Sequence, residues 1–64
     1  MLTDNEAKLF DLIQANETDK AIELISNGDV RINCLDKNGM NFVDQAAFKG
    51  NERLAKLLIE MGAD

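Results

Sequence analysis

The 64-residue chain contains no histidine and a single cysteine, Cys34. Histidine is the commonest acid–base group and metal ligand, so its absence removes the side chain on which many catalytic and metal sites depend. One cysteine cannot form a disulfide within the chain, which favours a reducing compartment. We interpret Cys34 as a small, buried hydrophobic residue, because it lies on the apolar side of an alternating segment.

Long apolar runs and an excess of basic charge are also missing. The longest apolar stretches, such as Leu57-Leu58-Ile59, have only three residues, so the sequence predicts no membrane insertion. Twelve acidic against seven basic residues give a net charge of −5. A phosphate backbone would be repelled on average, and no Lys/Arg cluster offsets the repulsion, so we expect no nucleic-acid partner.

Motifs for cofactors, metals and catalysis are absent as well. Asp36-Lys37-Asn38-Gly39 superficially resembles the start of a calcium loop, but Met40 to Val43 do not continue the series of oxygen ligands. The chain has no glycine-rich phosphate loop and no nucleophile–base pair. The carboxylates are scattered over helix starts and exposed faces, where we expect them to be solvated. The sequence therefore predicts no cofactor, no metal and no enzyme.

Four helices are predicted from the spacing of apolar residues and from turn-forming residues. Thr3 and Glu6 make a capping box before the first helix, expected over 4–15, and Asn16 separates it from a second helix over 18–26. A third helix starts near Asn41 and a fourth covers 52–61. The fourth helix should turn five apolar residues inward: Leu54, Ala55, Leu57, Leu58 and Met61. All four expected elements are α-helices, so the fold class is all-α.

The segment between the second and third helices has a different pattern. Val30, Ile32 and Cys34 alternate with polar residues, a period of two that indicates an extended arm. Asp36-Lys37-Asn38-Gly39 follows as a turn signal, since Asn and Gly tolerate positive φ. The sequence thus predicts a hairpin-like finger loop between the two helix pairs.

An internal repeat of 34 residues relates the two helix pairs. It joins Asn16 to Gly50, Ala21 to Ala55, Leu24 to Leu58, Ile25 to Ile59 and Gly28 to Gly62. A period in the low thirties is typical of stacked helical repeats, which usually need about three units for stability. We expect a helix-turn-helix solenoid with an N-terminal capping repeat over 1–33 and a second repeat over 34–64. We also expect it to be a fragment of a longer array, or to self-associate as a homo-oligomer through Leu57, Leu58 and Met61.

Residues 36–64 resemble the ankyrin repeat. The patterns Asp-x-x-Gly, Ala-Ala-x-x-Gly-Asn and Leu-Leu-x-x-x-Gly-Ala-Asp follow one another in register, whereas residues 6–33 match mainly through the second helix and Gly28. The chain departs from the family at Asn41-Phe42-Val43-Asp44, where the usual residues are Thr-Pro-Leu-His, so this turn lacks the proline and the threonine–histidine hydrogen bonds. The junction Val30 to Met40 is similar to the first repeat junction of ankyrin-repeat and MYND-domain proteins. The cysteine and histidine array of their zinc-binding module is absent.

The resemblance implies a cytoplasmic scaffold that binds a protein partner without catalysis. In the family, finger tips and the ends of the inner helices line the binding surface. The matching residues here are Lys37, Asn38, Met40, Phe48 and Lys49. Two alternatives remain open: Phe48 can simply pack against a neighbouring helix while the lysines are solvated, and the whole segment can be a structural N-terminal cap that stabilises a longer array.

Overall fold

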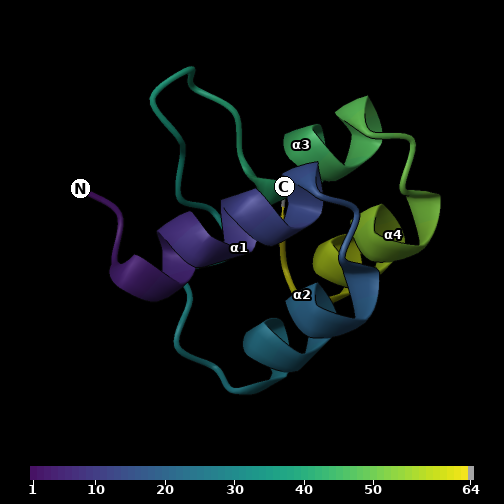
Figure 1. Ribbon diagram of the computed structural model, residues 1–64, viewed down its shortest axis with the longest axis horizontal. Helices are drawn as coiled ribbons and strands as arrows, with labels where there is room; N and C mark the ends of the chain where they lie inside the picture. The colour runs from purple at the N-terminus through teal and green to yellow at the C-terminus, as the bar shows by residue number, and fades with distance from the viewer. Residues whose placement is uncertain (64) are drawn as a thin grey trace.

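The computed structural model describes residues 1–63 and contains two helix pairs joined by a long arm (Figure 1). The first pair is α1 (Asp4–Gln14) and α2 (Thr18–Ser26), and the second is α3 (Phe42–Phe48) and α4 (Glu52–Glu60). Helix α1 packs against α2 and α3, and α3 packs against α4. No strand occurs among the described residues, so the predicted all-α class is confirmed.

The helix starts follow from local hydrogen bonds that the sequence already encodes. Thr3 and Glu6 form the predicted capping box before α1. A second capping box precedes α3, where the Asn41 side chain accepts from the Asp44 backbone N–H at 2.8 Å and Asp44 Oδ2 accepts from the Asn41 N–H at 3.1 Å. This reciprocal pair gives α3 a capped start without the proline and the threonine–histidine pair of the family pattern.

The 34-residue repeat is visible in the backbone geometry. Asn16, with φ 56°, and Gly50, with φ 72°, both adopt the left-handed conformation that ends a first helix. The amide after each of them makes the same bond, from Glu17 N to Leu12 O at 2.9 Å and from Asn51 N to Ala46 O at 2.8 Å. Asn16 therefore takes the place of a glycine rather than capping α2, whose N-cap is Glu17 with no side-chain hydrogen bond.

The core lies between the helix pairs and draws on all four helices. Helices α1 and α3 meet through the rings of Phe10 and Phe42, whose centroids are 4.3 Å apart. Phe42 occupies the position of the family's proline and is fully buried. No proline ring restrains φ at this position, but the phenylalanine side chain makes apolar contact with α1. The buried core residues are Leu9, Phe10, Ile13, Ala21, Ile25, Phe42, Ala46, Leu54, Leu58 and Ala63.

The fourth helix differs from the prediction in which residues face inward. Leu54 and Leu58 are fully buried, but Met61 is 44% exposed beyond the helix end. The interpretation of Leu57, Leu58 and Met61 as one exposed apolar face is therefore wrong for Leu58, which packs into the core with α3. Helical spacing places residues on a face, but only the packing partner decides how much of that face is covered.

The arm over residues 27–41 carries the predicted alternation. Val30, Ile32 and Cys34 are half-buried against the core, while Arg31 and Asn33 between them are exposed. Figure 1 shows this segment, coloured teal, running from the end of α2 at the bottom of the view to a finger at the top. The period of two therefore marks an extended arm that lies along the helix pairs rather than a strand in a sheet.

Candidate partner-binding surface

The finger turn is built around the side chain of Asp36. Its Oδ1 accepts from the backbone N–H groups of Asn38 at 2.8 Å and Met40 at 3.0 Å, and the Asp36 N–H donates to the Met40 carbonyl at 2.9 Å. The backbone hydrogen bond from Met40 is the main cause that lowers the pKa of Asp36 below its ordinary value. Asp36 is thus a structural residue of the turn, which leaves the two residues after it at the tip.

A buried glutamine fastens the finger to α3. Gln45 Nε2 donates to Asp36 Oδ2 at 2.9 Å and also lies 3.6 Å from the sulfur of Met40. Gln45 is buried, and none of the buried side-chain polar atoms of residues 1–63 lacks a hydrogen-bond partner. Since a satisfied polar contact fixes the geometry of the groups it joins, the finger is held in a defined position relative to α3.

The five residues predicted as binding residues lie at the two ends of α3. Lys37 and Asn38 are exposed at the finger tip, and Met40 is half-buried beside Gln45. Phe48, the last residue of α3, is 77% exposed, and Lys49 follows it as the exposed C-cap. Phe48 lies six positions after Phe42, the first residue of α3, which corresponds to about 9 Å of helix rise. The structure therefore places the predicted residues in two patches along one helix rather than in one cluster.

The two lysines of this surface are exposed and lie outside the ion pairs of the described residues. The ion pairs of the described residues join Lys20 to Glu17, Arg31 to Glu6 and Arg53 to Asp19. Lys37 and Lys49 take part in none of them. The exposed ring of Phe48 therefore has one cation beside it, Lys49, while Lys37 lies in the separate patch at the finger tip.

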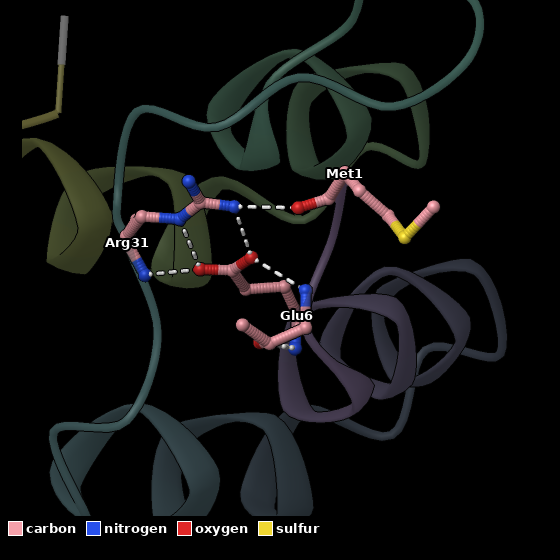
Figure 2. A network of polar contacts seen from close by, with 4 residues as sticks. Met1, Glu6 and Arg31 are labelled. Atoms are coloured by element: carbon pink, nitrogen blue, oxygen red, sulfur yellow. Dashed lines mark hydrogen bonds and ion pairs between the residues drawn. The ribbon is translucent and has the colours of Figure 1, made fainter.

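Sequence reasoning missed the strongest polar network, which ties α1 to the arm (Figure 2). The Glu6 carboxylate accepts from Arg31 Nη2 at 2.8 Å, from Arg31 Nε at 2.9 Å and from the Arg31 backbone N–H at 2.8 Å. Arg31 Nη2 also donates to the Met1 carbonyl at 3.0 Å. The expectation that carboxylates are solvated is wrong for Glu6, which is fully buried.

The Arg31 hydrogen bonds, together with that from the Thr3 backbone, hold the pKa of Glu6 well below its usual range. The Glu6 carboxylate in turn raises the pKa of Arg31. Glu6 and Arg31 are 25 residues apart, so the capping box at Thr3 was the only sequence signal for this network. Its partners are all within the protein, and we assign it to stability rather than to binding.

The acidic side chains and Cys34 are the remaining candidates for chemistry among the described residues. No group of three or more Cys, Asp or Glu side chains among residues 1–63 is placed to hold a metal ion. Cys34 is half-buried, and desolvation is the main cause that raises its pKa, which keeps the thiol protonated. None of the helices described is long and apolar enough to cross a bilayer.

Comparison with known protein families matches residues 9–59 to ankyrin repeats (many copies). The match covers most of the 64-residue chain, and the chain belongs to the ankyrin-repeat family. Ankyrin repeats are typically non-catalytic and generally mediate protein–protein interaction. The predicted helix-turn-helix repeat fold is thereby confirmed.

Proposed function

We propose that this chain binds a protein partner through the finger tip and the exposed end of α3. The observation that carries the proposal is Phe48, a large aromatic side chain that is 77% exposed at a helix end beside Lys49. Such a residue has no stabilising role in the core, and exposed aromatic side chains are typical anchors of protein interfaces. Lys37 and Asn38, held in place by the Asp36 turn, add polar specificity.

The chemistry of the surface defines the kind of partner. Phe48 offers apolar area, while Lys37 and Lys49 offer exposed cations that take part in none of the ion pairs of the described residues. The partner segment should therefore present an apolar side chain with acidic residues on its flanks. Cytoplasmic localisation belongs to this proposal, as does the finer resemblance of the junction Val30 to Met40 to ankyrin-repeat and MYND-domain proteins.

The test uses a variant that changes only exposed side chains, Phe48→Ala with Lys37→Ala and Lys49→Ala. The immobilised chain captures partners from cell extract, and the affinity of each identified partner is then measured for wild type and variant. We expect binding to weaken at least about tenfold, since interface anchors contribute more than about 1 kcal/mol each. A matched control, Ile59→Ala with Lys56→Ala on α4, should bind as wild type does. Equal affinity for the triple variant would refute the proposal.

A second function, that of an N-terminal cap, is favoured by a separate observation. The residues Phe42, Ala46, Leu54 and Leu58, all fully buried, form the side of the second helix pair that faces the first. A shift of 34 residues maps them onto Lys8, Leu12, Lys20 and Leu24, which line a hollow on the outer side of α1 and α2. Lys8 thus stands where the second pair has the buried Phe42, and Lys20 stands where it has the buried Leu54. The terminal repeat of a stack requires a polar outer face of this kind.

A further inference from the structure

Met40 occupies a different environment from the other two methionines of the chain, Met1 and Met61. Met1 is fully exposed, and Met61 is 44% exposed at the end of α4. Met40 follows the finger tip and is half-buried, and its sulfur accepts a hydrogen bond from Gln45 Nε2 at 3.6 Å. The sulfur of Met40 is therefore part of the polar contact that joins the finger to α3.

The amide group of Gln45 holds the finger through two acceptors at once. Its nitrogen also donates to Asp36 Oδ2 at 2.9 Å, while Asp36 Oδ1 accepts from the backbone N–H groups of Asn38 and Met40. An amide nitrogen carries two hydrogens, so the carboxylate and the thioether together use both of them. Gln45 is only 5% exposed, so a hydrogen that loses its acceptor here is costly. A change at the sulfur therefore acts on the whole contact.

We propose that Met40 is an oxidation site at which a peroxide loosens the finger from α3. The thioether sulfur attacks one peroxide oxygen, the O–O bond breaks, and the proton of the transferred oxygen passes to the leaving hydroxide. The products are methionine sulfoxide and water, so the sulfur is oxidised and the peroxide is reduced. Met40 is half-buried rather than enclosed in the core, so an oxidant as small as hydrogen peroxide can reach its side chain.

Oxidation removes the acceptor that Gln45 uses. The sulfur of a sulfoxide is electron-poor, so it no longer accepts from Gln45 Nε2. The new oxygen is a good acceptor, but a sulfur–nitrogen distance of 3.6 Å leaves no room for an oxygen atom between the two groups. One side chain must therefore move before the bond can form again. Because the same nitrogen holds Asp36, this movement weakens the contact that fixes the finger turn.

The consequence for binding rests on the proposed function, in which the finger tip contacts the partner. Met40 is one of the predicted binding residues, and oxidation turns its flexible apolar side chain into a polar one. Lys37 and Asn38 lie on the turn that Asp36 and Gln45 hold in place. Partner affinity should therefore fall on oxidation. It should recover after treatment with methionine sulfoxide reductases A and B, which together reduce both sulfoxide epimers.

Hydrogen peroxide treatment of the folded chain tests the site, with one thioether removed at a time. Met61→Leu keeps the site and Met40→Leu removes it, and leucine preserves most of the apolar volume. Peptide mass spectrometry measures oxidation at each methionine. NMR records the side-chain amide signal of Gln45 and hydrogen exchange at the backbone N–H groups of Asn38 and Met40.

For wild type and Met61→Leu, we expect Met40 sulfoxide, a shifted Gln45 amide signal and exchange at least about threefold faster, as for the loss of one hydrogen bond. Met40→Leu should show no peroxide-dependent change in the finger.

Three results would overturn the proposal. Met40 could stay reduced while Met1 and Met61 are oxidised. Met40 sulfoxide could leave the Gln45 signal and both exchange rates unchanged. Met40→Leu could respond to peroxide as wild type does. Partner affinity is measured separately: a finger that loosens with no loss of affinity supports the oxidation site and contradicts the role of the finger in binding.

Discussion

Glu6 shows how one residue can bury a charge at little cost. Among residues 1–63 it is the only charged side chain that is buried, and its two oxygens accept from Thr3 N–H and from three nitrogens of Arg31. A buried carboxylate is tolerated when its lone pairs are filled and a counter-charge lies against it. Arg31 itself remains 63% exposed at its side chain, so only one of the two ions is fully removed from water.

The Glu6→Gln variant should lose stability in a pH-dependent manner. Folding lowers the pKa of Glu6 from 4.5, so the carboxylate contributes stability above about pH 4.5 and this contribution is lost as the pH falls below that value. We expect Glu6→Gln to lower the free energy of unfolding by about 2 kcal/mol at pH 7, and by less at pH 3. Urea unfolding at both pH values measures the difference. Glu23→Gln, on the exposed side of α2, is the control, and a Glu6 effect that stays constant with pH would contradict this account.

At the scale of elements, short turns decide where each helix ends and the next begins. Asn16 and Gly50 hold the same left-handed position in the two repeats, and Asn51 both caps α4 and donates to the Thr18 hydroxyl at 2.7 Å. This last bond ties the two helix-to-helix turns to each other across the repeat interface. The turns are therefore local in sequence but help to fix the stacking of the pairs.

Gly50→Ala should cost about 1 kcal/mol of stability, because an L-residue is strained at φ 72°. No atom lies within 4 Å of the position that a Cβ would occupy there, so the cost comes from the backbone and not from a clash. Gly50→Asn should cost clearly less than Gly50→Ala, as Asn16 adopts this conformation at the equivalent position. Thermal melting of the three chains provides the comparison. Equal destabilisation by Ala and Asn would show that the backbone conformation is not the cause.

At the scale of the whole molecule, neither helix pair has a core of its own. The apolar residues of α1 and α2 are buried together with Phe42, Ala46, Leu54 and Leu58 in a single cluster. Arg53 on α4 also lies 4.0 Å from Asp19 on α2, although so exposed a pair contributes little. A chain of this size buries only about 60% of its unfolded surface. A fragment without half of the cluster would bury too little apolar surface to offset the conformational entropy that is lost on folding.

Residues 1–33 alone should therefore be unfolded, whereas the full chain should unfold in one cooperative transition. Isolated helices of this length are marginal in water without a packing partner. Far-UV circular dichroism should show weak, non-cooperative melting for the fragment. For the full chain, circular dichroism and amide hydrogen exchange should report the same transition. A cooperative melt of the fragment would mean that the first repeat is an independent unit.

Much of the fold could be predicted because its signals are local. Capping boxes, left-handed turn residues and helical periodicity act between residues at most a few positions apart, so they fixed four helices and the finger turn close to their observed bounds. The exposure of Lys37, Asn38 and Lys49 was also predictable, since they lie at a turn and a helix end. Their role in binding stays a prediction.

The sequence by itself determined the repeat, the helices and the chemistry of the finger. Only the tertiary structure decided which apolar residues are covered: Phe42 and not Phe48, Leu58 and not Met61. It also brought Glu6 to Arg31 and Gln45 to Asp36. The physical reason is that burial and ion pairing depend on partners from other elements, whereas helix formation depends on neighbours along the chain.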